Sequence, residues 1–181
     1  MLLEFGYSSL ILDQRGIGET NAPIFPLEED FNRFTQGKEA SQYLMATDAI
    51  DAINAITQKQ KIKNIAIVGE SMGGRNAIIT ASSDSRIKSV IVISSAGYSQ
   101  TFADQNLNRF ITHINPNSYI TKISPRRILM LHSLHDTVIP IKEAQNTFSQ
   151  AKNPKEFIEF NETECIHGYC KPMKPFIKDE L

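Results

Sequence analysis

Three polar residues that lie far apart in the chain, Ser71, Asp136 and His167, have the side-chain types that acyl transfer uses. Ser71 lies in the segment Gly69-Glu70-Ser71-Met72-Gly73, a G-x-S-x-G pattern that directly follows an apolar run. Glycines two positions before and after a serine permit a turn too sharp for larger side chains, and that turn presents the hydroxyl group at the end of a strand. The pattern predicts that Ser71 is a nucleophile.

A serine hydroxyl needs a base to take its proton, and the base needs an acid that orients it. Asp136 and His167 follow two successive apolar runs, so both are expected in loops at the carboxyl ends of strands. We therefore expect His167 to act as the base and Asp136 as the orienting acid.

Each of these residues also has a structural alternative. Ser71 could cap the helix that follows it, Asp136 could shape a turn before a helix, and His167 could be a surface histidine with His135 as the base. The flanking glycines favour the nucleophile, and His135 directly precedes the expected acid, which makes it a less suitable third partner.

Other candidate polar residues are expected to have structural roles. His113 and His132 are interpreted as structural histidines. Arg75 is interpreted as a solvated charge, with a contact to a substrate carboxylate as the alternative.

Cys165 and Cys170 lie on either side of His167. A single such cluster is a weak signal for zinc, and the C-x-x-C spacing of a redox site is absent. We expect reduced, structural thiols, with a disulfide that rigidifies the histidine loop as the alternative.

The elements that would position these residues alternate along the chain. Helical apolar spacing predicts one helix over Tyr43 to Ile56, a helix over Arg75 to Ala81 and another over Ile141 to Ala151 after Pro140. Apolar runs rich in Ile, Val and Leu predict five buried strands: Tyr7 to Leu12, Asn64 to Val68, Lys88 to Ile93, Arg127 to His132 and Glu156 to Phe160.

Alternation of this kind predicts an α/β fold with a mostly parallel five-stranded sheet and helices on both faces. We expect a single domain over residues 1–181 with no linker, and a long surface loop over Asn21 to Gly37. Between Gly97 and Pro125 we expect only one polar helix, around Asp104 to His113, and therefore an open, shallow site for small or soluble esters.

The chain order Ser, Asp, His resembles that of the α/β-hydrolase superfamily. Asp13 to Gly18, of the form D-x-R-G-x-G, resembles a strand-end turn of that family, and the Ser-Met-Gly-Gly segment is similar to carboxylesterases and monoacylglycerol-lipase-like enzymes. The resemblance implies an acyl-enzyme on Ser71 and a water activated by His167, with no metal or organic cofactor.

Compared with the family, the chain is expected to be N-terminally truncated. Met1 to Phe5 resembles the end of the helix after the family's third strand, so the loop that carries one oxyanion donor has no counterpart. Only the backbone N–H of Met72 can be assigned to the oxyanion hole. An inactive or weakly active remnant, or a fragment with a binding role, is therefore the alternative to an active hydrolase.

Composition narrows the classes of partner. The 19 basic and 20 acidic side chains give no field that attracts nucleic acid or an anionic membrane. We expect a small-molecule acyl substrate, and pairing of copies through an open sheet edge is the oligomer that the missing strand would permit.

A cytoplasmic location is expected because the sequence has no signal peptide or apolar span. The last four residues, Lys178-Asp179-Glu180-Leu181, match an endoplasmic-reticulum retention address. Without a signal peptide we interpret that match as a coincidence.

Overall fold

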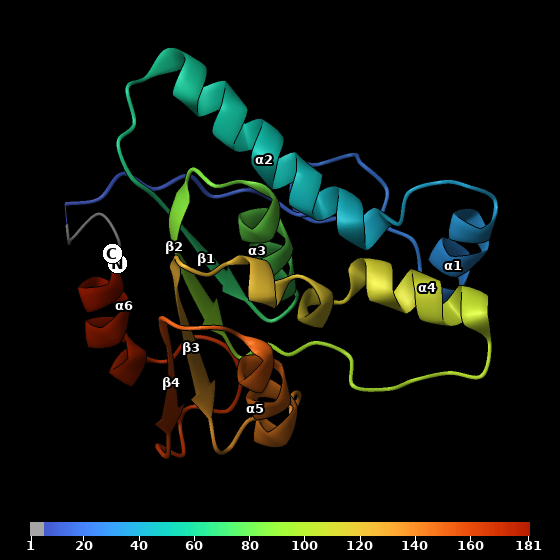
Figure 1. The fold of residues 1–181 in the computed structure, drawn as a ribbon. Coiled ribbons are helices and arrows are strands. Elements are labelled where there is room, and N and C mark those ends of the chain that lie inside the picture. Colours follow the sequence, from blue (N-terminus) through green and yellow to red (C-terminus); the bar gives the residue numbers. More distant parts are fainter. Residues whose placement is uncertain (1–5) are drawn as a thin grey trace.

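A parallel four-stranded sheet forms the centre of the computed structural model, which describes residues 6–181 (Figure 1). The strands lie in chain order, and each is hydrogen-bonded in parallel to the next. Their bounds are β1 Ile65–Glu70, β2 Ile87–Ile93, β3 Arg127–Ser133 and β4 Lys155–Phe160. Four of the five predicted strands are therefore confirmed, each to within two residues at its ends.

Helices connect and cover these strands. The α-helices are α1 Leu27–Thr35, α2 Ser41–Lys59, α3 Met72–Ser83, α4 Gln105–Ile114, α5 Ile141–Gln150 and α6 Lys174–Glu180. Short 3-10 turns lie at Pro116–Ser118, Ile120–Lys122 and Lys171–Met173. The predicted helices over Tyr43 to Ile56, Arg75 to Ala81, Asp104 to His113 and Ile141 to Ala151 are all present.

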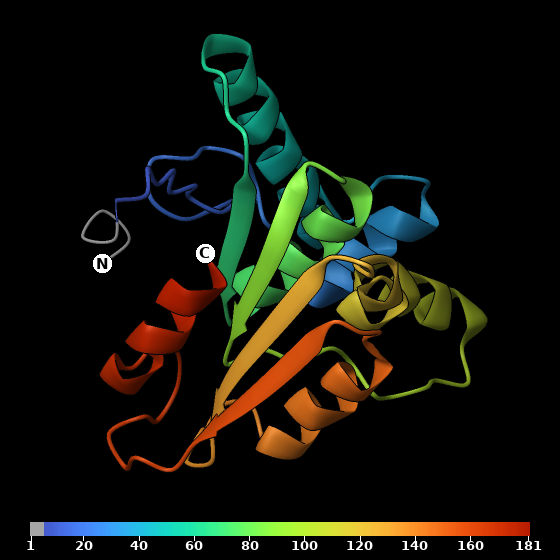
Figure 2. The same ribbon diagram turned by 60° about the vertical axis from the view of Figure 1, so that its left-hand side comes forward.

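Helices lie on both faces of the sheet, as the apolar strand sequences predict. On one face, β2 and β3 pack through Val90 and Met130 against α3 and α5, in a cluster that also includes Ile53 of α2. On the other face, alternate residues such as Ile91 and Leu129 pack against α6. Figure 2 shows α6 alone on its side of the sheet, with α5 and α3 on the opposite side.

The predicted strand over Tyr7 to Leu12 is absent. These residues have no regular secondary structure, and Ile11 is 87% exposed. A strand satisfies its backbone N–H and C=O groups through neighbouring strands, and no strand in residues 6–181 lies on the outer side of β1. The sheet therefore has four strands in place of five, with β1 at one edge.

The predicted surface loop over Asn21 to Gly37 contains helix α1. Its sequence carries the signals of a helix: Pro26 before the first turn, Glu28, Glu29 and Asp30 in that turn, and Arg33 in the last. Asp30 is fully buried, and its carboxylate accepts hydrogen bonds from the backbone N–H and the hydroxyl group of Ser41, at the start of α2. The resemblance noted for Met1 to Phe5 lies outside the described residues.

The first three residues of the C-terminal tetrapeptide, Lys178 to Glu180, form the end of helix α6. Glu180 has little exposure, forms an ion pair with Arg127 of β3 and accepts a hydrogen bond from Ser89 of β2. Leu181 packs against the apolar cluster on the α6 face. In this conformation, the last two of the four residues that match a retention address are packed against the protein. No helix in residues 6–181 is both long and apolar enough to cross a membrane.

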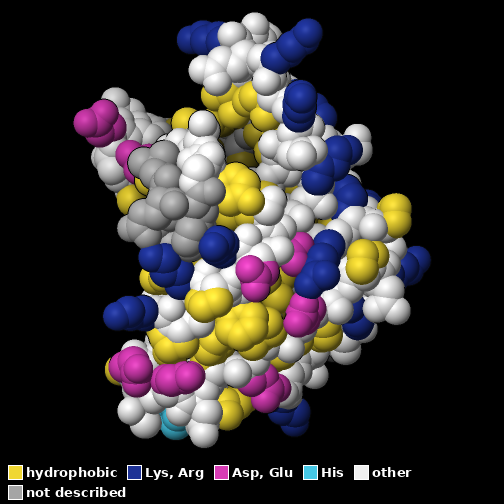
Figure 3. Space-filling model, turned by 90° about the vertical axis from the view of Figure 1, so that its left-hand side faces the viewer, with side chains coloured by type: hydrophobic (Ala, Val, Ile, Leu, Met, Phe, Trp, Pro, Cys, Tyr) yellow, Lys and Arg dark blue, Asp and Glu magenta, His cyan; other side chains and the backbone are white. Residues whose placement is uncertain are grey.

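The uncovered part of the sheet is next to β1. The pairing places Val68 on the same face as Ile91, but α6 covers β2 and β3, and Val68 remains 36% exposed. On the side that carries α6, apolar side chains are visible among charged ones (Figure 3). Exposed apolar residues of the described chain include Tyr7, Val68 and Phe176.

Candidate active site

Ser71 lies on a sharp turn between β1 and α3, as its sequence context predicts. Its backbone has φ 51° and ψ −117°, a region that a non-glycine residue rarely adopts. A Cβ on Gly69 would lie 2.2 Å from the carbonyl oxygen of Gly73, and a Cβ on Gly74 would lie 2.6 Å from Cβ of Ser95. Both glycines are therefore required by the close approach of neighbouring atoms.

The strained backbone of Ser71 is held by its surroundings. Its N–H donates to the carbonyl oxygen of Ile93 at 2.9 Å, and its carbonyl oxygen accepts from the hydroxyl group of Ser95 at 2.7 Å. The side chain of Ser71 makes no capping hydrogen bond to α3, although the residue occupies the N-cap position. The alternative interpretation of Ser71 as a helix cap is therefore wrong, and strain at an uncapped serine is typical of a functional position.

Asp136 and His167 meet at the carboxyl ends of β3 and β4. His167 Nδ1 lies 2.9 Å from Asp136 Oδ2 and 3.0 Å from Oδ1. Asp136 Oδ1 also accepts hydrogen bonds from the N–H groups of Val138 and Ile139, at 2.9 and 2.8 Å. Asp136 thus shapes a turn and contacts the imidazole at the same time, so the turn-forming role does not rule out the predicted one.

The carboxylate of Asp136 is fully buried yet stays ionised. Burial raises its pKa, but the hydrogen bonds from Ile139, His167 and Val138 together outweigh burial and leave the pKa of Asp136 below its ordinary value. The imidazole of His167 retains 25% exposure, so one side of the ring reaches solvent while the other contacts the acid.

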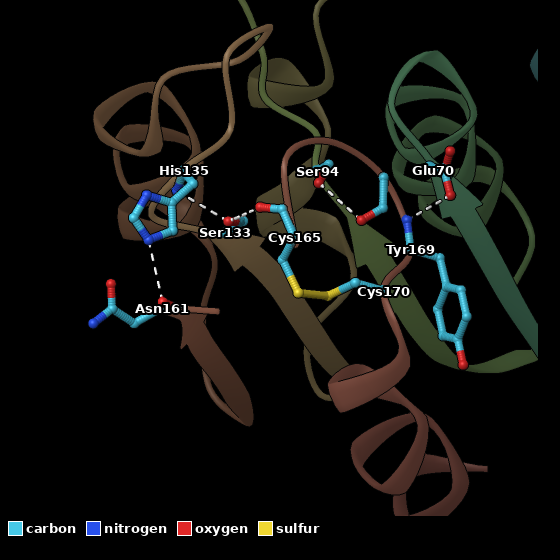
Figure 4. The surroundings of a disulfide bond; sticks show 9 residues. Glu70, Ser94, Ser133, His135, Asn161, Cys165, Tyr169 and Cys170 are labelled. Carbon is cyan, nitrogen blue, oxygen red and sulfur yellow. Dashed lines mark hydrogen bonds between the residues drawn. A yellow bond between two sulfur atoms is a disulfide. The ribbon is translucent and has the colours of Figure 1, made fainter. Parts of the chain in front are cut away.

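The other histidines do not take the place of His167. His135 Nε2 lies 3.1 Å from the carbonyl oxygen of Asn161 (Figure 4), so this ring contacts a different loop. His113 lies 2.8 Å from Glu39 and stacks on Tyr43, as a structural histidine does.

His132 is buried directly behind Asp136. Its Nε2 lies 2.9 Å from the carbonyl oxygen of Ile139 and 3.5 Å from Asp136 Oδ2. Burial lowers the pKa of His132 and outweighs the opposite effects of Ile139 and Asp136, which favours the neutral ring. His132 therefore packs as a structural residue that contacts the acid.

Ser71 is not hydrogen-bonded to the base in this structure. Within residues 6–181, none of the hydrogen bonds joins Ser71 Oγ to His167. Catalytic hydrogen bonds are often long without substrate and tighten when it binds. The structure brings Asp136 and His167 together and places Ser71 at the same carboxyl end of the strands.

The N-terminus of α3 carries the predicted oxyanion donor. Met72 is the first residue of that helix, so its N–H has no partner within the helix. The side-chain amide of Gln14 lies close by, with Nε2 3.2 Å from the place of a Cβ on Gly73. Sequence reasoning did not identify Gln14, because the contact joins two segments that no local pattern connects.

Arg75 is tied to the protein. Its Nε donates to the carbonyl oxygen of Ala96 at 2.8 Å, its Nη1 donates to the hydroxyl group of Tyr98 at 2.8 Å, and the guanidinium lies over the Tyr98 ring. The prediction of a solvated charge is therefore wrong, and Arg75 fixes the segment after β2 against α3.

Cys165 and Cys170 form a disulfide, so the prediction of reduced thiols is wrong and its alternative holds. The bond closes the loop that carries His167 (Figure 4). Cys165 is buried in the cluster on the α6 face, and its carbonyl oxygen accepts a hydrogen bond from the Ser133 hydroxyl group. In the described part of the chain, no group of three or more His, Cys, Asp or Glu side chains is arranged to bind a metal ion.

A polar hollow lies away from these residues. Its volume is about 610 Å³, and it lies between the segment after β2, α4 and α5, with Tyr98, Asn108 and Asn146 in its wall. Ser71, Asp136 and His167 do not line it. Leu134, Val138 and Ile166, which are exposed, instead belong to the loops that carry Asp136 and His167.

Comparisons with known proteins agree with this architecture. The sequence profile described as alpha/beta hydrolase fold matches residues 2–113. A protein named "Uncharacterized protein YfhR" from Escherichia coli O157:H7 is 28% identical over 160 residues, which are 83% of this chain and 56% of that protein. Its counterpart from strain K12 is 27% identical over the same shares. The chain thus spans a little over half the length of these relatives.

Solved structures show the same fold at low identity. The Pyrococcus furiosus esterase Pf2001 superposes with a TM-score of 0.67 at 19% identity, over 98% of this chain and 68% of that one. The alpha/beta hydrolase GrgF from Penicillium sp. sh18 gives a TM-score of 0.59 at 16% identity, over 82% of this chain and 68% of that one.

Proposed function

Because this chain belongs to the α/β hydrolase fold family, we propose that it is a serine hydrolase that cleaves carboxylic ester or related acyl bonds. The observation that carries the proposal is the hydrogen-bonded pair of Asp136 and His167, at the carboxyl ends of the strands, where Ser71 occupies a strained turn. A buried acid, an oriented imidazole and an uncapped serine are the three groups that acyl transfer requires. The esterase name of the Pyrococcus furiosus protein supports an ester as the substrate.

In the proposed reaction, His167 Nε2 takes the proton of the Ser71 hydroxyl group while Oγ attacks the acyl carbonyl carbon. Asp136 remains ionised, holds the ring through Nδ1 and stabilises the imidazolium that forms. The Met72 N–H binds the developing oxyanion. His167 then gives its proton to the leaving group, and a water that it activates releases the acyl group from Ser71.

The surroundings favour an open acyl site. Leu134, Val138 and Ile166 expose apolar side chains on the loops of the acid and the base. The chain between β2 and β3 carries α4 and two 3-10 turns. An exposed apolar rim suits a small acyl group that remains partly in water.

Covalent labelling tests the proposal. A fluorophosphonate probe should label the folded chain on Ser71, and Ser71→Ala should abolish labelling. His167→Ala should slow it by at least about 100-fold, the scale of general-base catalysis. Ser83→Ala, at the other end of α3, is the matched control and should label at the wild-type rate. Failure of the folded wild-type chain to react would contradict the proposal.

A second candidate is a binding protein of this fold without turnover. It is favoured by the absence of a Ser71 to His167 hydrogen bond in the described residues. Steady turnover of p-nitrophenyl acetate that disappears in Ser71→Ala would exclude this candidate.

A further inference from the structure

The loop that carries His167 is held from several sides. Between Cys165 and Cys170, the disulfide closes a loop of six residues. The hydroxyl group of Ser133 donates to the carbonyl oxygen of Cys165, and that of Ser94 donates to the carbonyl oxygen of Gly168 at 3.4 Å. Ser133 is the last residue of β3 and Ser94 directly follows β2, so the loop is hydrogen-bonded to the carboxyl ends of two central strands.

A further anchor comes from Glu70, the residue that directly precedes Ser71. Its Oε2 accepts a hydrogen bond from the backbone N–H of Tyr169 at 2.8 Å, across 99 positions of sequence. Figure 4 shows the Glu70 side chain extending from the end of β1 to this amide. Glu70 pairs in register with Ile93, which lies on the α6 face, and this places its side chain on the side where the loop passes.

Gly168 fits the same contact. Its φ is +78°, and a Cβ at this position would lie 2.5 Å from Oε1 of Glu70. The loop thus offers Glu70 both an N–H donor at Tyr169 and an open backbone at Gly168. The carboxylate occupies space that any side chain at position 168 would fill.

The position of Glu70 in the chain gives this contact its importance. Ser71 follows β1 and His167 follows β4, the two outer strands of the sheet, so β2 and β3 lie between their strands. Glu70 is covalently joined to Ser71 and hydrogen-bonded to the residue two positions after His167. It is therefore a direct link between the turn of the nucleophile and the loop of the base.

We propose that Glu70 is a positioning residue that sets the distance between Ser71 and His167 by holding the backbone of Gly168 and Tyr169. This inference rests on the proposed serine-hydrolase function. Asp136 fixes the rotation of the imidazole through Nδ1, and Glu70 fixes the place of its backbone relative to Ser71. A displacement of about 1 Å in such a pair costs about 100-fold in rate.

The first experiment compares Glu70→Ala with Glu70→Gln. The alanine variant lacks the acceptor for the Tyr169 N–H, so its kcat and its rate of fluorophosphonate labelling should fall about 10- to 100-fold. KM should change by less than about twofold, because the substrate contacts stay in place. The glutamine variant keeps an acceptor oxygen of the same reach and should retain most of the activity. Wild-type kcat in Glu70→Ala, or equal losses in both variants, would overturn the inference.

A double-mutant cycle separates this contact from general damage. Gly168→Ala should displace Glu70 and strain the backbone, and should reduce kcat on its own. In the Glu70→Ala background, the added loss should be smaller, because the side chain that it displaces is gone. Losses that multiply in full would show that the two residues act independently and would contradict the inference.

A readout without activity distinguishes failure of this inference from failure of the proposed function. The amide hydrogen of Tyr169 should exchange with solvent faster in Glu70→Ala, while that of Ile158 in β4 should be unchanged. If the wild-type chain never labels on Ser71, the proposed function fails, and the exchange result still tests the anchor. If the wild-type chain labels and neither exchange nor labelling responds to Glu70→Ala, only the inference fails.

Discussion

The loop of His167 and the segment from Tyr7 to Leu12 were both expected to belong to the central sheet region, yet only the loop is joined to the sheet by side-chain contacts. The loop contacts the sheet through Ser94, Ser133 and Glu70, and a disulfide closes it. Most of the N-terminal segment is exposed and without regular structure. The difference shows that a few side chains of neighbouring segments can hold a loop through hydrogen bonds. A strand instead needs a second strand beside it to pair its backbone N–H and C=O groups.

The turn that follows the N-terminal segment is intermediate between the two. Asp13 accepts a hydrogen bond from the N–H of Glu19, and Arg15 forms two hydrogen bonds of 2.7 Å with Asp48 of α2. The D-x-R-G-x-G pattern therefore makes these side-chain contacts although none of the described residues before it forms a strand. Contacts made by charged side chains survive where the backbone pairing is absent.

The largest expected effect lies at the acid. Asp136→Asn should reduce kcat about 10⁴-fold, because an amide no longer holds the imidazole in the required tautomer. Its Oδ1 can still accept from Val138 and Ile139, so the turn and the melting temperature should change little. The rate of p-nitrophenyl acetate turnover measures the effect. Activity within tenfold of wild type would show that another group orients His167.

Removal of the disulfide should have the next largest effect. The double substitution Cys165→Ala with Cys170→Ala should lower the free energy of unfolding by about 2 kcal/mol, from the loop entropy alone. Urea denaturation, with the wild-type chain under oxidising and reducing conditions, measures the change. An unchanged midpoint would mean that the hydrogen bonds of Ser94, Ser133 and Glu70 are sufficient to hold the loop.

The buried histidine behind the acid predicts a dependence of stability on pH. Because the pKa of His132 is lowered in the folded chain, the unfolded chain binds a proton first as the pH falls below the ordinary value of 6.5. The contribution of His132 to the free energy of unfolding should therefore be fully present above that pH. Below it, the free energy of unfolding should decrease by at most about 1.4 kcal/mol per pH unit because of this residue. His132→Asn keeps a donor for the Ile139 carbonyl oxygen and should flatten the slope. The same slope in both proteins would assign it to other groups.

The smallest effects are expected in the N-terminal region. Arg15→Met should cost up to about 1 kcal/mol, the scale of a partly exposed ion pair. Ile11→Ser is its control, because a side chain that is 87% exposed contributes little, and its effect should stay within about 0.5 kcal/mol. Thermal unfolding of both variants provides the measurement. A larger loss in Ile11→Ser than in Arg15→Met would show that Ile11 is buried in solution.

The sequence predicts the parts of the fold that depend on local pattern. Continuous apolar runs identify β1 to β4, because strands buried on both faces carry apolar residues at successive positions. A stripe of apolar residues identifies α2, because a helix buried on one face carries them at helical spacing. The turn at Ser71 is predictable from the G-x-S-x-G pattern, but the structure requires glycine at 69 and 74, whereas a Cβ on Gly73 would approach only the side chain of Gln14. Helix α1 carried readable signals, and the two prolines near its start led to the prediction of a loop.

Other features depend on contacts between distant segments and have no such record. The run from Tyr7 to Leu12 is apolar enough for a strand, but the sequence does not say whether a neighbour is present to pair with it. The disulfide and the hydrogen bond from Tyr169 to Glu70 both require knowledge of which loops meet. For the candidate site, the contact between Asp136 and His167 could be expected from their places after two strands, whereas the anchors around His167 could not.

The hydrogen bond between Glu70 and Tyr169 also matters to protein engineering. Loop exchange between relatives treats the stretch around His167 as a portable module that can be cut at its two cysteines. In this chain the loop is also hydrogen-bonded to Glu70, which lies outside it, at the first variable position of the G-x-S-x-G pattern. A graft that moves the loop into another scaffold should therefore carry Glu70 and Gly168 as a matched set.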